Sequence, residues 1–173
     1  MKKLICALLC VLMLATALVA CDKAPSEQPE ATLKMGLGVY TATPTTTDAT
    51  EEKDGSNQVE TTIFAAAVDA DGKVIKGFSD CVQLKFGFDA TGKATAVPTE
   101  IKSKFELGSN YGMTAIGKQE WYIQAAAFDA ACIGKTGIEI AALATADGKG
   151  VESLQTAGCT ITVTGLVKAA SKI

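Results

Sequence analysis

Apolar and polar residues alternate along much of the first half of the chain, which is the pattern of half-buried β-strands. This alternation predicts strands over residues 35–40, 59–68, 73–81, 82–89 and 93–97. Between them, residues 69–72 and 89–92 have the form Asp-x-x-Gly, in which Asp caps a turn and Gly tolerates a positive φ. We therefore expect tight hairpins, and an exposed loop or ragged hairpin over the Thr-rich residues 41–57.

A calcium site is the alternative interpretation of Asp69-x-Asp71-Gly72. The segment lacks the further oxygen ligands and the closing Glu of acidic calcium-binding loops. The hairpin turn is therefore the favoured interpretation.

The second half changes to helical spacing. Trp121, Ala125, Phe128 and Cys132 recur at i, i+4, i+7 and i+11, which predicts one apolar helix face ending before a C′ glycine at Gly134. A capping box over residues 136–139 then predicts a second short helix to about residue 144.

The last segment, residues 156–170, mixes a Thr/Val-rich half that favours strand with an Ala/Lys-rich half that favours helix. We predict a helix from about Ile161, with Thr160 as its N-cap. The chain as a whole then has the α+β class: an antiparallel sheet of hairpins from the first half, and two or three helices from the second half packed on one face.

The N-terminal residues carry a targeting pattern. A basic start at Lys2 and Lys3 precedes an apolar run to Ala20, which is typical of a signal peptide. The stretch Leu18-Val19-Ala20-Cys21 resembles the lipobox of bacterial lipoproteins. That resemblance implies a diacylglycerol on the Cys21 thiol and cleavage just before it, whereas a plain secreted protein and a retained membrane span are the alternatives.

Three regions follow from this interpretation: a signal peptide over residues 1–20, a polar flexible tether over 21–33 and a single domain over 34–173. We expect the lipid on Cys21 to hold the domain at the outer face of the cytoplasmic membrane, or at the cell surface. Without the leader, 14 lysines face 19 acidic residues, a formal charge of −5 (14 − 19).

The chain has neither Arg nor His, and this excludes several function classes. Histidine zinc sites and Ser-His triads are excluded outright, and no basic cluster predicts a nucleic acid partner. No nucleophile is paired with a base, so a binding or structural module is favoured over an enzyme. Outside the leader and Cys21, we favour buried reduced thiols at Cys81, Cys132 and Cys159, with one disulfide plus one free thiol as the alternative.

Thr160 is the one candidate site residue with an argument from chemistry. At a helix start it would lie where free N–H groups attract an anion, and Gly158 would let a phosphate approach. The alternative is an ordinary N-cap. The loop over residues 108–113 is a second candidate, either functional or a plain connection, and Trp121 is interpreted as a core residue rather than a ligand-stacking ring.

From Met35 onward the chain resembles uncharacterised lipoproteins of anaerobic Gram-positive bacteria. The stretches that carry this resemblance are residues 35–40, 71–74, 106–113, 117–122 and 134–136. More distantly, it is similar to the FMN-binding domain family, whose signature Asp-x-x-Ser-Gly-Ala-Thr carries FMN on the final Thr. Gly158, Cys159 and Thr160 match the last three positions, whereas Leu154 and Ala157 replace the Asp and the Ser.

These departures favour non-covalent over covalent FMN binding. The resemblance therefore implies a membrane-anchored module with a small-molecule ligand, for which FMN is a candidate, serving surface redox chemistry or ligand capture. The alternative is a structural or interaction lipoprotein that has no cofactor.

Overall fold

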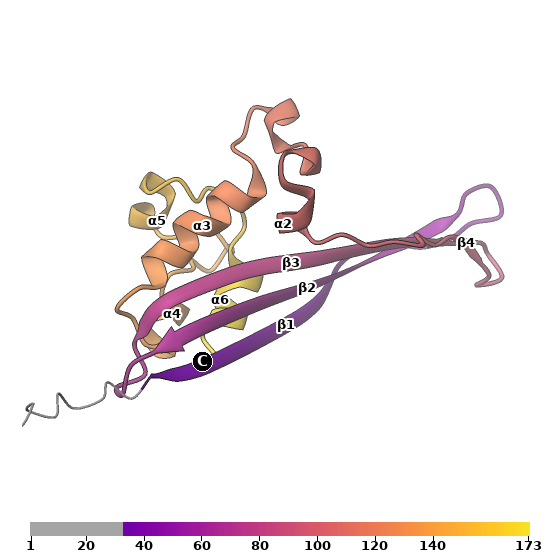
Figure 1. Cartoon of the computed structure of the whole chain (residues 1–173). Coiled ribbons are helices and arrows are strands. Elements are labelled where there is room, and N and C mark those ends of the chain that lie inside the picture. The colour runs from indigo at the N-terminus through magenta and orange to yellow at the C-terminus, as the bar shows by residue number, and fades with distance from the viewer. Residues whose placement is uncertain (1–32) are drawn as a thin grey trace, which may run out of the picture. The chain divides into compact units, whose positions relative to one another are not determined.

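The computed structural model describes residues 33–173, so Cys21, the predicted signal peptide and most of the predicted tether lie outside the described residues. An antiparallel sheet dominates this part of the chain (Figure 1). Its strands follow sequence order: β1 (Lys34–Thr47), β2 (Gly55–Val68), β3 (Val74–Phe88) and the short β4 (Ala94–Ala96).

The two predicted hairpin turns are confirmed. The Asp69 carboxylate accepts hydrogen bonds from the backbone N–H groups of Asp71 and Lys73, at 3.0 and 2.8 Å. Asp89 binds the N–H groups two and four residues later in the same way. Gly72 and Gly92 have φ of 76° and 83°, which a side chain would strain. The turns therefore form because each Asp replaces missing backbone partners and each Gly closes the loop.

The prediction of a loop over residues 41–57 was too broad. The β1 strand continues to Thr47 and β2 begins at Gly55, so only residues 48–54 connect them. Pro44 lies at the register shift of β1, where an edge strand tolerates a residue without an N–H. The predicted break at residues 81–82 is also absent, because β3 pairs with β2 without interruption there.

Helices cover one face of the sheet (Figure 1). They are α2 (Lys104–Leu107), the 3₁₀ turns η1 (Gly108–Tyr111) and η2 (Met113–Ile116), α3 (Trp121–Cys132), α4 (Gly137–Ala141), α5 (Glu152–Thr156) and α6 (Thr164–Ala170). The predicted α+β class is therefore confirmed. The apolar face of α3 and the capping box of α4 are as predicted, although α4 ends three residues early. The prediction of two or three helices was too low, because α2 and α5 were not foreseen and residues 33–173 contain five α-helices.

The core lies between the sheet and the helices. Phe64 of β2 and Phe128 of α3 meet edge to face, with ring centroids 6.3 Å apart. Asp129 fastens α3 to β3, because it accepts hydrogen bonds from both the N–H and the hydroxyl of Ser79. At Gly38 a Cβ would lie 1.9 Å from the carbonyl oxygen of Ala169, so only glycine lets α6 pack this close to β1.

The predicted start of the last helix is wrong, and Thr160 is not its N-cap. The helix α6 begins at Thr164, after a segment that forms an isolated bridge between Lys149 and Thr162. The N–H of Val163 also donates to the carbonyl of Gly148, at 2.8 Å. Thr162 and Val163 therefore pair with the turn near Gly148, and the helix does not begin until Thr164.

Candidate functional site

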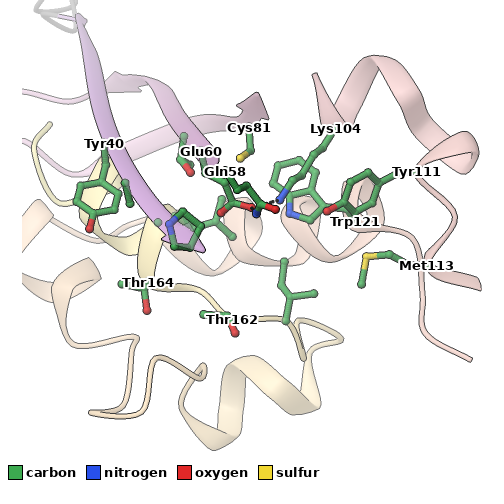
Figure 2. Close-up of a pocket in the computed structure, with 16 residues that line it drawn as sticks. Tyr40, Gln58, Glu60, Cys81, Lys104, Tyr111, Met113, Trp121, Thr162 and Thr164 are labelled. Carbon is green, nitrogen blue, oxygen red and sulfur yellow. Dashed lines mark hydrogen bonds and ion pairs between the residues drawn. The ribbon is translucent and has the colours of Figure 1, made fainter. Parts of the chain in front are cut away.

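A cavity of about 560 Å³ opens between the inner face of the sheet and the start of α6 (Figure 2). Its walls come from β1, β2 and β3 on one side and from α2, η1, the start of α3 and the 161–166 segment on the other. This volume falls in the range of sites for small molecules. The cavity is therefore the candidate functional site of the described residues.

A buried ion pair lies on the cavity wall. The Lys104 Nζ is 3.4 Å from the Glu60 Oε1, and the Nε2 of Gln58 donates to the same oxygen at 3.0 Å. The Lys104 side chain is only 9% exposed, whereas that of Glu60 is 29% exposed. Water in the cavity can therefore reach the carboxylate more easily than it reaches the ammonium.

Two aromatic rings enclose the same ammonium. The Lys104 Nζ lies 5.2 Å from the centroid of Tyr111 and 5.7 Å from that of Trp121, within the range of cation–π attraction. Figure 2 shows the lysine side chain running between these rings and Glu60. Burial acts to lower the pKa of Lys104, but its neighbours Cys81, Glu60 and Tyr111 raise it above its ordinary value. Lys104 is therefore a fixed positive charge at neutral pH.

Two further lysines lie beside Tyr40, a residue that lines the cavity. The Nζ atoms of Lys168 and Lys172 lie 4.9 and 5.9 Å from its ring centroid, and Lys168 also approaches the Tyr40 hydroxyl at 3.4 Å. Within residues 33–173, neither lysine has a carboxylate within 4.0 Å. Neither lysine is itself among the residues that line the cavity.

Two threonines lie opposite the ion pair. Thr162 and Thr164 line the cavity together with the apolar residues Ile161 and Leu166, and Figure 2 shows both threonines on the side away from Lys104. Hydroxyl groups both donate and accept hydrogen bonds. The cavity thus combines a cation, aromatic rings and hydroxyls around a partly apolar interior.

One carboxylate holds the η2 part of the wall in place. Glu120 accepts hydrogen bonds from the N–H groups of Met113 and Thr114, at 3.1 and 3.0 Å, and from the Thr114 hydroxyl at 2.9 Å. These bonds, led by the Thr114 N–H, lower the pKa of Glu120. The residues 108–113 singled out in the sequence thus contribute Tyr111 and Met113 to the cavity.

The cysteines within residues 33–173, Cys81, Cys132 and Cys159, are buried free thiols, as favoured from the sequence. Only Cys81 lines the cavity. Burial raises its pKa, although Lys104 acts in the opposite direction, and burial raises the pKa of Cys132 to about 12 and of Cys159 to about 11. All three are therefore protonated at neutral pH and are weak nucleophiles.

The site residues predicted from the sequence lie beside this cavity and do not line it. Cys159 is fully buried, and Gly158 has a φ of 103° that favours glycine. The N–H and hydroxyl of Thr160 both donate to the Oε1 of Gln124, at 2.8 and 3.0 Å. Thr160 thus has its donors engaged and is four residues before the first residue of α6, so it offers no helix N-terminus to a phosphate.

Sequence reasoning missed Lys104 and Glu60 as site residues, although one signal was present. Glu60 and Thr62 fall on the same face of β2 as Phe64, because side chains alternate along a strand. A charged residue on the face that packs the core indicates a polar cavity or a buried partner. Trp121, interpreted as a core residue, is both a core residue and part of the cavity wall.

No protein-family model, curated protein or solved structure matches the chain. Among residues 33–173, none of the helices has the length and apolar character needed to cross a bilayer. The same residues contain no cluster of three or more Cys, Asp or Glu side chains placed to hold a metal ion.

Proposed function

We propose that the chain is a lipid-anchored extracytoplasmic binding module whose cavity takes a small aromatic anion. The observation that carries this proposal is Lys104, a buried cation beside the rings of Tyr111 and Trp121 on the wall of a cavity of about 560 Å³. The anchor rests on the lipobox pattern at Cys21. FMN, which the family resemblance suggests, has the aromatic ring and the phosphate charge that such a site would select.

The fit of FMN differs from the sequence expectation. Gly158, Cys159 and Thr160 do not suit the phosphate, because Cys159 is buried and Thr160 is bonded to Gln124. The residue that would hold an anionic group is Lys104, the aromatic rings beside it would contact the flavin, and the threonine hydroxyls of the opposite wall would bond other polar atoms of the ligand. Bound FMN would supply one- and two-electron chemistry, as expected of a surface redox protein.

Ligand binding is tested through the single tryptophan, Trp121, which lines the cavity and so reports its occupancy. Purified protein is titrated with FMN and with riboflavin, which has the same ring system without the phosphate, and free tryptophanamide corrects for flavin absorbance. We expect saturable quenching by FMN, weaker affinity for riboflavin, and loss of the difference in Lys104→Met. If neither flavin quenches saturably, the flavin proposal fails and a structural or interaction lipoprotein without cofactor is favoured.

The anchor has its own test, so the two parts of the proposal can fail separately. Intact mass of the protein extracted from membranes should correspond to a chain beginning at Cys21 and carrying a diacylglycerol. Cys21→Ser should keep the leader and lose the lipid mass. An unmodified chain that still begins at Met1 would overturn the lipoprotein assignment without bearing on the cavity.

A further inference from the structure

The face of the sheet opposite the helices is bare within the described residues (Figure 1). In β2, Thr62, Phe64 and Ala66 are buried beneath the helices, so Ile63 and Ala65 point to the other side. The register places Leu37 of β1 and Phe78 of β3 on either side of Ala65 on that outer face. Met35 is 76% exposed and Leu37 is 67% exposed, so large apolar groups are left in contact with water.

This outer face carries very little charge. Successive outward positions of β2 are Val59, Thr61, Ile63, Ala65 and Ala67, and those of β1 include Met35, Leu37, Val39 and Thr41. On β3 the outward positions from 76 to 82 are Lys76, Phe78, Asp80 and Val82. An apolar face of this extent is unusual on a monomeric soluble domain and indicates an interaction surface.

The outer face of the sheet has the shape of a groove. Ala65 and Ala67 form a low floor along β2, with Met35 and Leu37 on one side and Phe78 on the other. Phe105 of α2 extends the second wall, since its ring meets that of Phe78 at 5.0 Å between centroids. A surface with a bulky ridge beside a groove of small residues fits an inverted copy of itself.

Its charges are self-complementary as well. Lys76 and Asp80 lie two residues before and two residues after Phe78, with opposite sign. About a two-fold axis near Phe78, Lys76 of each copy would face Asp80 of the other, as the symmetry of an isologous interface requires. The Asp80 Oδ1 accepts N–H bonds from Cys81 and Phe105, which fixes the carboxylate at this edge.

The area is adequate for such a contact. The three long strands have 14, 14 and 15 residues. At about 3.3 Å per residue and about 4.8 Å between strands, their full length presents roughly 650 Å² in projection, and the residues placed on the face above, 35–41, 59–67 and 76–82, present roughly 360 Å² of it. A sandwich that uses the full length of the strands would approach the ~800 Å² that each partner contributes to a standard interface.

We propose that this outer face of β1, β2 and β3 packs against the same face of a second copy of the chain, forming a two-fold symmetric sheet sandwich. The acidic balance of the chain, 16 Lys against 19 acids, disfavours a bilayer with anionic lipids as the occupant. The proposal does not depend on the cavity or its ligand.

The first test measures the mass of the full-length chain in detergent by sedimentation velocity over a range of concentrations. We expect a dimer that Leu37→Glu converts to monomer, whereas Ile138→Glu, at an exposed position (87%) on the helical side, leaves it intact. Lys76→Glu should weaken the dimer about tenfold or more. Circular dichroism must show all three Glu variants folded, because only then does loss of the dimer report on the face.

The second test cross-links the chain in its own membrane, where detergent plays no part. Ala65→Cys should give a doubled mass with a short bis-maleimide, and Ile138→Cys should not. A chain that is monomeric in detergent and unlinked in membranes overturns the proposal, as does a dimer that persists in Leu37→Glu. A cross-link from Ala65→Cys to a different protein would also overturn it.

Discussion

Replacing Lys104 with Met tests whether the buried ion pair stabilises the fold. At 3.4 Å and an effective dielectric constant of about 20, the attraction to Glu60 is about 5 kcal/mol. The cation–π contacts with Tyr111 and Trp121 add about 1–2 kcal/mol. Removing the ammonium from water costs several kcal/mol and offsets most of this.

Because methionine keeps the apolar packing and Glu60 remains open to cavity water, we expect a net loss of roughly 1–3 kcal/mol. For a domain of this size that lowers the melting temperature by roughly 3–9 °C. Lys102→Met is the matched control, since Lys102 is 55% exposed and its pair with Glu100, at 3.8 Å, contributes at most about 1 kcal/mol.

The assay is urea unfolding followed by far-ultraviolet circular dichroism, because Trp121 lies beside the substituted side chain and its fluorescence would change for local reasons. A Glu60→Gln variant and the double variant complete the cycle, and we expect a coupling energy of about 1–3 kcal/mol between the two positions. Equal midpoints for Lys104→Met and Lys102→Met would refute the reasoning. The attraction within the ion pair would then no more than offset the free energy of desolvation, and a stabilising role for Lys104 would be excluded.

Three further predictions concern the support of the site. Gln124→Leu should cost about 1–3 kcal/mol in urea unfolding and Thr160→Val less, because the first removes the acceptor for two hydrogen bonds and the second removes one donor. Burial raises the pKa of Cys132 to about 12 and that of Cys159 to about 11. The stability contributed by these protonated thiols is therefore fully present below pH 9.0 and is lost as pH rises through the raised pKa values. Melting temperatures measured from pH 7 to 11 should fall less steeply in the double Ala variant. Hydrogen bonds from η2 lower the pKa of Glu120. The stability that its carboxylate contributes is therefore present above the ordinary carboxyl pKa and is lost on acidification. Glu120→Gln should be less stable at pH 7, and its melting temperature should fall less steeply as the pH is lowered.

Local rules were enough to predict much of the fold. The turns at Asp69 and Asp89, the apolar face of α3 and the capping box at Thr136 each depend on residues within about one helical turn of one another. The start of α6 was beyond such rules, because Thr162 and Val163 pair with the turn near Gly148 and Thr160 bonds to Gln124. Helix propensity therefore lost to a tertiary contact that no local pattern records.

The candidate site was harder for the same reason. Glu60 and Lys104 are 44 residues apart in the sequence, and only the hairpin register together with the position of α2 brings them together. The family resemblance directed attention to Thr160, which lies next to the cavity segment 161–166 in sequence. Thr160 itself does not line the cavity, because its donors are bonded to Gln124, whose role the sequence did not reveal.

The two candidate surfaces share the same strands, because successive side chains of a strand point to opposite faces of the sheet. Thr62 lines the cavity while Thr61 and Ile63, its neighbours in sequence, point to the outer face. A substitution in the middle of β2 changes the side chain on one face, but a shift of the backbone there would reach the other face as well. Leu37→Glu on edge strand β1 and Lys104→Met on α2 avoid this difficulty. If the cavity and the outer face act independently, each variant should abolish one property and leave the other unchanged.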